Sequence, residues 1–348
     1  MDKIKYMRRA LELAELGRGT TSPNPMVGCV IVHNDQIIGE GFTQPYGQAH
    51  AEVMAIRSVE NEKILPEATA FVTLEPCSHH GKTPPCADLL ISKGLKQVVI
   101  GTVDNNPLVG GQGIAKMKEA GIAVEVGILE EECRAMNIRF FTALEKKRPY
   151  VILKWAQTAD GFVARDNFDS KWISGSASRA LVHQWRAHED AIMVGTNTAK
   201  YDNPRLNVRG WEGKDPVRVV IDKKLQLSKD LNLFDGQQPT LVYNELEDHE
   251  ATNLSYIKVD SSDYVNFILR DLNDRKIQSI IIEGGSGLLD SFINLNLWDE
   301  ARVFTAPKTF TSGIKAPIIN RKSFKTIPIE EDTLDFYRNS EPSELLKS

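Results

Sequence analysis

The chain has 348 residues, a length that predicts two domains rather than one. Its composition is that of a globular protein, and its formal net charge of −5 argues against a general binder of nucleic-acid phosphates. No stretch approaches the roughly 20 apolar residues of a membrane span, and the N-terminus lacks the pattern of a signal peptide. We therefore expect a cytoplasmic protein with neither membrane nor nucleic-acid partners.

Helices and strands alternate along the first 146 residues. The periodicity predicts helices at residues 4–17, 51–58, 87–93 and 113–119. It predicts strands at residues 27–32, near 37–38, and at 68–74, 97–103 and 122–129. Such alternation is typical of helices packed on a central sheet.

A domain boundary is predicted at Lys146-Lys147-Arg148-Pro149, because three consecutive cations and a proline make a poor core and a good exposed connection. The expected domains are residues 1–146 and 147–348. In the second, the pattern predicts strands at residues 150–154, 191–194, 217–221, 240–243, 279–282 and 301–304, and helices at 177–187, 264–274 and 287–295. The second domain is therefore also expected to be α/β.

One histidine and two cysteines form a candidate metal site in the first domain. His50 opens a predicted helix, Cys77 follows a predicted strand, and Cys86 precedes another helix. An imidazole and two thiolates give zinc three protein ligands and leave the fourth tetrahedral position to water, which the ion makes nucleophilic at neutral pH. Glu52, two residues after His50, can carry protons between that water, a ring nitrogen and a departing amine.

Less specific interpretations of these residues stay open at this point. His50 could be a hydrogen-bonded residue at a helix N-terminus, and the two cysteines could form a disulfide. The two cysteines could also be ligands of a purely structural zinc site, whose fourth protein ligand would be His79 or His80. The pattern H-x-E followed by P-C is the zinc-deaminase arrangement, but its usual cysteine spacing is C-x-x-C. Here eight residues separate Cys77 from Cys86.

Several longer stretches resemble one family, the bifunctional riboflavin-biosynthesis deaminase/reductases. They are residues 21–29 (TSPNPMVGC), 50–52, 73–86, 104–107, 154–161 (KWAQTADG), 172–174 and 283–286. The long insertion between the cysteines is typical of this family, and the resemblance fades only after about residue 307. Two loops depart from the family pattern: DNNP at 104–107 replaces D-P-N-P, and WISG at 172–175 replaces W-I-T-S.

The resemblance implies a cytidine-deaminase-like α/β/α sandwich followed by a dihydrofolate-reductase-like α/β domain. It implies zinc-dependent hydrolytic deamination of a diamino-pyrimidinone ribotide in residues 1–146. NADPH-dependent reduction of the ribosyl group to ribityl would follow in residues 147–348. It also implies that zinc is held by His50, Cys77 and Cys86, with Glu52 as proton carrier. The residues implied in the deaminase substrate pocket are Asn24, His79, Lys82, Asp104 and Asn106.

For the second domain, the resemblance implies two sets of residues and, for the whole protein, a homo-oligomer. NADPH would contact Ala156, Trp172, Thr198, Asp202, Gly285, Ser286, Gly287 and Leu288. The substrate would contact Lys154, Ser170, Arg186, Leu206, Arg209 and Glu283. The chemistry is compatible, because a glycine-rich turn that opens a helix can bind phosphate and arginines pair bidentately with phosphate oxygens. As a bare motif the glycine-rich stretch could equally be a tight turn.

Two other classes of function remain as alternatives. A zinc deaminase of another free or RNA-borne base, joined to a non-reducing second domain, would favour a basic groove and the short cysteine spacing. The second alternative is a non-catalytic binding module that zinc only stabilises. Such a site requires no proton carrier, so Glu52 beside His50 argues against it.

Overall fold

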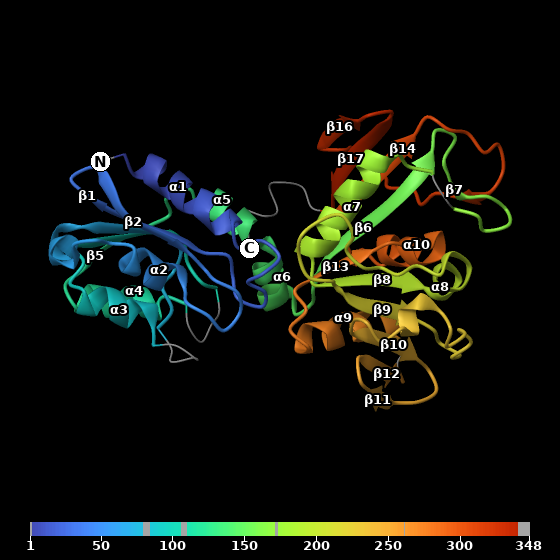
Figure 1. Cartoon of the computed structure of the whole chain (residues 1–348), viewed down its shortest axis with the longest axis horizontal. Helices are drawn as coiled ribbons and strands as arrows, with labels where there is room; N and C mark the ends of the chain where they lie inside the picture. Colours follow the sequence, from blue (N-terminus) through green and yellow to red (C-terminus); the bar gives the residue numbers. More distant parts are fainter. Residues whose placement is uncertain (1, 79–83, 106–109, 171–172, 261, 340–348) are drawn as a thin grey trace. The chain divides into compact units, whose positions relative to one another are not determined.

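The computed structural model describes residues 2–78, 84–105, 110–170, 173–260 and 262–339. The chain divides into two compact units, Met1–Lys147 and Arg148–Ser348. Each unit has its own hydrophobic core. Each also has its own main sheet, whose strands are labelled in Figure 1.

The first unit is built on a five-stranded sheet in the order β2-β1-β3-β4-β5. Its strands are β1 (Gly28–His33), β2 (Gln36–Phe42), β3 (Thr69–Leu74), β4 (Gln97–Thr102) and β5 (Ala123–Val126). Its helices are α1 (Lys3–Glu15), α2 (Ala51–Arg57), α3 (Cys86–Ser92), α4 (Gln112–Glu119), α5 (Glu130–Met136), α6 (Ile138–Lys146) and the 3-10 helix η1 (Glu62–Glu67). Strands β3, β4 and β5 are parallel, and β1 runs antiparallel to both of its neighbours.

Helices cover both faces of this sheet. Side chains alternate between the two faces of a strand, so Cys29 and Ile31 of β1 face the core beneath α2, α3 and α4, whereas Val30 and Val32 face α1 and α5. Figure 1 shows the same three layers. The predicted α/β/α sandwich is therefore confirmed.

Two glycines let helices approach the sheet closely enough to place the site. A Cβ on Gly28 of β1 would lie 1.8 Å from the carbonyl oxygen of Ala10 in α1. A Cβ on Gly41 of β2 would lie 2.4 Å from the amide nitrogen of Ala55 in α2. Any side chain at Gly41 would push α2 away from the sheet, and with it the helix start that carries His50 and Glu52.

The second unit is built on a ten-stranded sheet in the order β11-β12-β10-β9-β8-β13-β6-β14-β17-β16, with a small separate sheet of β7 and β15. Its strands are β6 (Tyr150–Thr158), β7 (Phe162–Ala164), β8 (Ala191–Gly195), β9 (Val217–Ile221), β10 (Thr240–Asn244), β11 (His249–Ala251), β12 (Leu254–Lys258), β13 (Ser279–Ile282), β14 (Glu300–Ala306), β15 (Ile314–Lys315), β16 (Lys325–Ile329) and β17 (Asp332–Arg338). Its helices are α7 (Ser176–His188), α8 (Thr196–Asp202), α9 (Tyr264–Asp274), α10 (Ser286–Asn294) and the 3-10 helix η2 (Asn232–Phe234).

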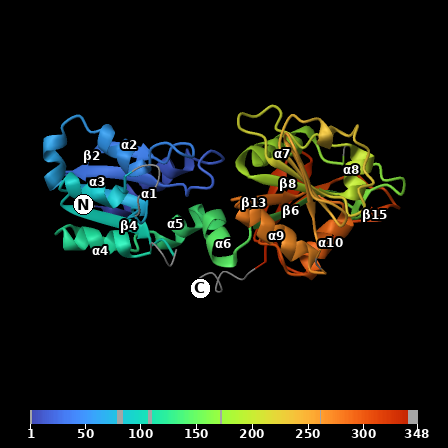
Figure 2. The same ribbon diagram turned by 90° about the horizontal axis from the view of Figure 1, so that it is seen from below.

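The middle of this sheet is parallel from β12 to β14, and helices pack on both of its faces. Helices α9 and α10 bury their apolar side chains in the larger core, while Val182 of α7 packs against Phe304 and Leu334. Figure 2 shows α9 and α10 on one side of the sheet and α7 on the other. The carboxyl ends of β6, β8 and β13 meet at one edge, where open α/β sheets place their ligands.

Several elements differ from the sequence prediction. The strand predicted at residues 122–129 stops at Val126, because Gly127 takes a left-handed φ of +99° and the chain turns into α5. Helices α6 and α8 were not predicted, nor were β7, β11, β12, β15 and the β16–β17 hairpin.

The exposed connection between the two units is shorter than the predicted stretch, residues 146–149. Lys146 and Lys147 are exposed, but Arg148 forms a bidentate ion pair with Asp299, with Nη1–Oδ2 at 2.5 Å and Nη2–Oδ1 at 2.8 Å. Only 12% of the Arg148 side chain and 8% of that of Asp299 are exposed. Arg148 therefore anchors the start of β6 and is not part of an exposed linker.

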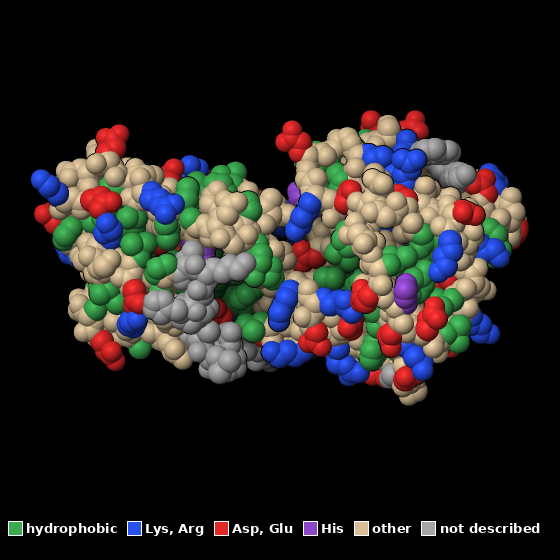
Figure 3. Space-filling model, turned by 60° about the horizontal axis from the view of Figure 1, so that its bottom comes forward, with side chains coloured by type: hydrophobic (Ala, Val, Ile, Leu, Met, Phe, Trp, Pro, Cys, Tyr) green, Lys and Arg blue, Asp and Glu red, His purple; other side chains and the backbone are tan. Residues whose placement is uncertain are grey.

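The surface is mixed in charge. Figure 3 shows positive and negative side chains interspersed on both units over the face displayed. None of the described helices combines the length and the apolar character that crossing a bilayer would require.

Candidate active sites

His50, Cys77 and Cys86 converge in the first unit. His50 Nδ1 lies 3.7 Å from Cys77 Sγ and 3.3 Å from Cys86 Sγ. The ligand atoms of the three residues all lie within 4.8 Å of one another, and no other cluster of three such side chains occurs among the residues the structure describes. His50 thus meets Cys77 and Cys86, which lie 27 and 36 positions further along the chain.

Three elements position these side chains. His50 is the residue before α2, Cys77 follows the buried end of β3, and Cys86 is the first residue of α3. The backbone N–H of Cys86 donates to Cys77 Sγ at 3.3 Å, and the N–H of Ala87 donates to the carbonyl oxygen of Cys77 at 3.1 Å. The first turn of α3 therefore folds onto Cys77, and the N–H of Cys86 favours the thiolate form of that residue.

The charges in this cluster are strongly coupled. The hydrogen bond from the Cys86 thiol, together with the one from His50, lowers the pKa of Cys77 to about 4, whereas the same bond to Cys77 and burial raise the pKa of Cys86. The hydrogen bond to Cys77 also raises the pKa of His50. Burial, followed by the negative charge of Cys77, raises the pKa of Glu52 to about 7. A bound divalent cation would favour the deprotonated form of each of these groups, so it would oppose the raised pKa of Cys86, His50 and Glu52 and lower that of Cys77 further.

These donors fit zinc. One imidazole nitrogen and two sulfurs are the ligand types that zinc prefers, and three protein ligands leave one position for a reactant. Glu52 is 3% exposed and stands beside the cluster without belonging to it. All four cysteines are free thiols, so the structure contains no disulfide between Cys77 and Cys86. The alternative fourth ligands His79 and His80 lie outside the described residues.

The loops that carry Asn24 and Asp104 meet the same edge of the sheet. Gly28, at the start of β1, donates its N–H to Thr73 Oγ1 at the end of β3, at 3.1 Å. Strand β4 is parallel to β3 and ends level with it, since Thr102 pairs with Leu74. The loop before β1 and the loops after β3 and β4 therefore share this edge. His79, Lys82 and Asn106 lie outside the described residues.

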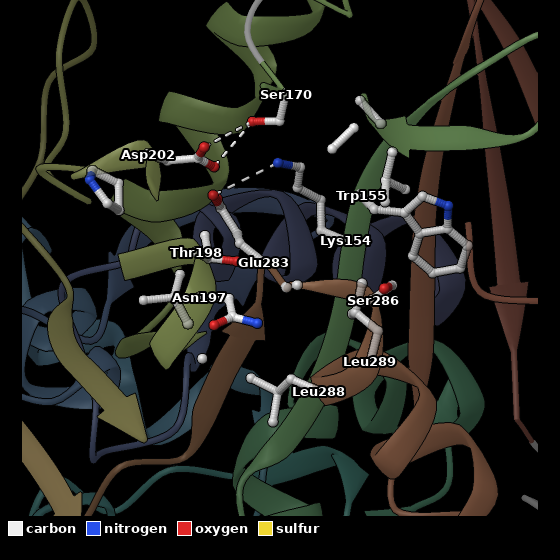
Figure 4. A pocket seen from close by; sticks show the side chains of 18 of the residues that line it. Lys154, Trp155, Ser170, Asn197, Thr198, Asp202, Glu283, Ser286, Leu288 and Leu289 are labelled. Carbon is white, nitrogen blue, oxygen red and sulfur yellow. Dashed lines mark hydrogen bonds and ion pairs between the residues drawn. The ribbon is translucent and has the colours of Figure 1, made fainter. Parts of the chain in front are cut away.

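The second unit contains a cavity of about 780 Å³ at the carboxyl ends of its parallel strands. Every described residue expected there lines it, although the sequence separates them by up to 134 positions. They are Lys154, Ala156, Ser170, Arg186, Thr198, Asp202, Leu206, Arg209, Glu283, Gly285, Ser286, Gly287 and Leu288. Trp172 lies outside the described residues. Figure 4 shows how several of these side chains are arranged.

A buried ionic triad lines part of this cavity. Arg186 donates from Nε to Glu283 Oε1 at 3.2 Å and from Nη2 to Oε2 at 2.9 Å, while Lys154 Nζ lies 3.6 Å from Oε2. Burial alone would raise the pKa of Glu283, but the charges of Arg186 and Lys154 lower it to about 2. Burial lowers the pKa of Lys154. Arg186 was expected to face a phosphate, yet two of its nitrogens are bound to this carboxylate.

Two further features of the cavity lining are a serine–carboxylate contact and the open start of α10. Ser170 Oγ donates to both carboxylate oxygens of Asp202, at 3.1 and 3.0 Å, as Figure 4 shows. Gly285 precedes α10, and a Cβ placed there would lie 3.3 Å from Thr198 Oγ1, whereas a Cβ on Gly287 would meet no atom within 4 Å. The start of α10 therefore offers backbone N–H groups beside open space.

The guanidinium of Arg209 binds a neutral amide oxygen, whereas that of Arg186 binds a carboxylate. Arg209 Nη1 donates to Asn207 Oδ1 at 2.7 Å, and the backbone N–H of Arg209 donates to His183 Nδ1 at 3.3 Å. Burial and the nearby charges of Arg186 and Arg205 lower the pKa of Arg209. Such a cluster of cations is stabilised by an anion.

Sequence reasoning missed some of the lining. His183, Arg179, Asn197 and Gln226 also face the cavity. Of these, His183 and Arg179 carried a signal, because they lie three and seven residues before Arg186 and hence on the same face of α7.

Comparisons with known proteins match both units. The family model described as the RibD C-terminal domain matches residues 149–331. The cytidine and deoxycytidylate deaminase zinc-binding region matches residues 1–102. Among curated relatives, the riboflavin biosynthesis protein RibD of Actinobacillus pleuropneumoniae is 42% identical, over 88% of this chain and 84% of its own. The RibD protein of Aquifex aeolicus is 41% identical, over 89% and 88%.

Solved structures agree with these matches. A diaminohydroxyphosphoribosylaminopyrimidine deaminase/5-amino-6-(5-phosphoribosylamino)uracil reductase of Thermotoga maritima is 40% identical, with a TM-score of 0.87 over 97% of this chain and 98% of its own. Acinetobacter baumannii RibD is 34% identical, with a TM-score of 0.88 over 97% and 99%.

Proposed function

The chain belongs to the RibD family of riboflavin-biosynthesis proteins, and from this membership we propose that its two sites act in succession on one pyrimidine ribotide. The protein is a bifunctional enzyme that combines a deamination with a reduction. The first proposed reactant is the diaminohydroxyphosphoribosylaminopyrimidine named for the Thermotoga relative. The second is the deaminated aminouracil that the first site releases.

In the first unit, a zinc-binding deaminase domain, we assign His50, Cys77 and Cys86 as the zinc ligands. Zinc, when bound there, supplies a Lewis acid that makes water nucleophilic at neutral pH. The Glu52 carboxylate takes a proton from the water and returns protons to the ring nitrogen and the departing amine, so that water is consumed and ammonia leaves. Its burial at 3% exposure keeps bulk water from competing for these protons.

Substrate recognition in this unit is assigned to the loops at the sheet edge. Asn24 and Asp104 can read an aminopyrimidine through its donors and acceptors. His79, Lys82 and Asn106 complete the proposed set from outside the described residues, with Lys82 as a point charge for the ribose phosphate.

In the second unit we propose that the cavity holds NADPH, which when bound supplies the hydride. The support is the open start of α10, whose N–H groups suit a cofactor phosphate, and a volume of about 780 Å³, large enough for a cofactor and substrate portion together. The proposed cofactor contacts are Ala156, Trp172, Thr198, Asp202, Gly285, Ser286, Gly287 and Leu288.

The proposed contacts of the sugar phosphate are Lys154, Ser170, Arg186, Leu206, Arg209 and Glu283. Their roles differ because their partners differ. Arg209 pairs with the phosphate, since only Asn207 binds its guanidinium among the contacts described. Arg186 orients Glu283 through two hydrogen bonds, and the Glu283 carboxylate then accepts hydrogen bonds from the sugar hydroxyls.

One observation carries the proposal: a three-ligand metal cluster beside a buried glutamate and a reductase cavity occur in the same chain. The test incubates the purified protein with the diaminopyrimidine ribotide and follows product mass with and without NADPH. Without NADPH, we expect exchange of an amine for a carbonyl oxygen and release of ammonia. With NADPH, the product should gain two further hydrogens. Deamination without any NADPH-dependent gain would overturn the reductase assignment.

Family membership disfavours the alternative of an RNA-borne base and a non-reducing second domain. We propose a cytoplasmic location, because the cytosol supplies NADPH and keeps the metal-binding thiols reduced. The homo-oligomer implied by the resemblance stays a prediction, which sedimentation velocity of the purified chain tests.

A further inference from the structure

Glu75 is a buried carboxylate to which the proposed reaction gives no role. It follows β3 directly, lies two residues before Cys77, and is only 6% exposed. A buried charge is stable only when it is paired or well hydrogen-bonded, so its partners indicate what it does.

Among the described residues, the partners of Glu75 are backbone groups of a single segment. Oε2 accepts the N–H of Asp104 at 3.4 Å and that of Gly111 at 3.0 Å. Oε1 accepts the N–H of Gly113 at 3.1 Å and that of Ile114 at 3.3 Å. One carboxylate therefore holds both ends of the connection from β4 to α4.

The same connection is packed tightly against the metal-ligand segment. Gly113 lies so close to Pro76 that a Cβ there would come within 2.3 Å of the Pro76 carbonyl oxygen. Gly111 takes a left-handed φ of +80°, which aims its N–H at Glu75. The segment that carries Asp104 is thus fastened to the segment that carries Cys77 by Glu75 and by this close contact.

We propose that Glu75 is a positioning residue for deamination, which holds Asp104 at a fixed distance from the Cys77 segment. The carboxylate is suited to this because its two oxygens accept four N–H groups in charge-assisted hydrogen bonds at the positive end of α4. A glutamine offers one acceptor oxygen, and its NH₂ group would face N–H groups of the backbone. The inference rests on the proposed role of Asp104 in substrate binding.

The test compares Glu75→Gln with the wild-type chain in both reactions. We expect the KM of deamination for the ribotide to rise about tenfold, as loss of a charge-assisted contact in the substrate loop would produce. The kcat should fall less than about threefold, because Glu52 and the metal ligands are untouched. Zinc should stay at one per chain, and reduction of the deaminated intermediate, assayed on the same sample, should be unchanged. Glu60→Gln, an exposed glutamate of the same unit, is the matched control.

A double-mutant cycle separates positioning from helix capping. If Glu75 acts through Asp104, the KM effect of Glu75→Gln should largely vanish in an Asp104→Asn background. Independent effects that multiply would overturn the proposal, as would an unchanged KM accompanied by loss of zinc. If Asp104→Asn alone leaves KM unchanged, the proposed function of Asp104 is wrong. If Asp104→Asn raises KM and Glu75→Gln does not, only the role of Glu75 is wrong.

A second variant covers the case in which Glu75→Gln does not fold. Glu75→Asp keeps the charge but shortens the reach by one methylene group, so KM should rise with zinc content and reduction preserved. An unchanged KM in Glu75→Asp would contradict the inference.

Discussion

Replacing Arg186 with methionine removes the cation that pairs with the buried carboxylate of Glu283. Methionine retains much of the aliphatic volume of the arginine side chain, so the loss of charge dominates. Side-chain exposure is 11% for Arg186 and 9% for Glu283, so water cannot compensate the carboxylate. Lys154 remains as a partner at 3.6 Å, too far for a good hydrogen bond.

The expected loss follows from the pKa of Glu283. A carboxyl whose pKa falls from 4.5 to about 2 on folding gains about 3 kcal/mol of stability at neutral pH. Because the folded pKa lies below the unfolded one, this stability is present above pH 4.5 and is lost as the pH falls towards about 2. Arg186→Met should therefore cost about 3 kcal/mol at pH 7, equivalent to about 6–12 °C in the Tm of a domain of this size. The cost should shrink below pH 4.5.

Differential scanning calorimetry of the full chain measures this loss. A chelator should shift the transition of the zinc-binding first unit and so identify the transition of the second. Arg270→Met, an exposed arginine of α9, is the matched control and should change stability by less than about 0.5 kcal/mol. Adding Glu283→Gln to Arg186→Met should recover part of the stability, because the buried carboxylate is removed, whereas Lys154 then loses its ion-pair partner. A loss below about 1 kcal/mol, or no recovery in the double variant, would refute this reasoning.

Three further predictions concern the reactions and the domains. Glu52→Gln should keep zinc but slow ammonia release by about 100-fold or more; near-normal release, with metal content measured in parallel, would contradict its role. By calorimetric titration, Arg209→Ala should weaken ribotide binding by about tenfold and leave NADPH binding unchanged. Gly285→Ala should do the reverse, because a Cβ there crowds the cofactor's approach, and the opposite pattern would exchange the two assignments. Residues 1–146 and 147–348, expressed separately, should each fold and keep one activity by circular dichroism and the two assays; a fragment soluble only with its partner would place the boundary elsewhere.

The deaminase chemistry could be predicted from local sequence. The residue types and spacing of His50-Ala51-Glu52 and the two cysteines are enough to predict a zinc site, because zinc prefers imidazole and thiolate ligands. The alternation of helices and strands was equally readable, since burial on one face imposes a period on each element. The long stretches shared with one family then indicated both domains and both reactions.

Elements without a clear period were missed. Helix α8 spans only Thr196–Asp202 and buries only Ala199, so its apolar face is too narrow to reveal a helix. The β16–β17 hairpin buries few of its residues and depends on pairing with β14, a strand that precedes it in the sequence. Strand pairing of this kind depends on side-chain contacts between two segments, so the sequence of either segment alone predicts it poorly.

The partners of the polar side chains were decided by tertiary structure. Sequence could nominate Arg186 as a phosphate ligand, but only the fold shows that Arg186 in α7 binds Glu283, which follows β13 and lies 97 residues away. Glu75 lies within the stretch 73–86 that resembles the family, but only the fold brings the N–H groups of Gly111, Gly113 and Ile114 to its oxygens. Residue type determines which interactions a side chain is able to make, whereas the packing of distant segments selects the one that forms. A buried charge must take a partner that the fold brings within reach, and no local pattern encodes that choice.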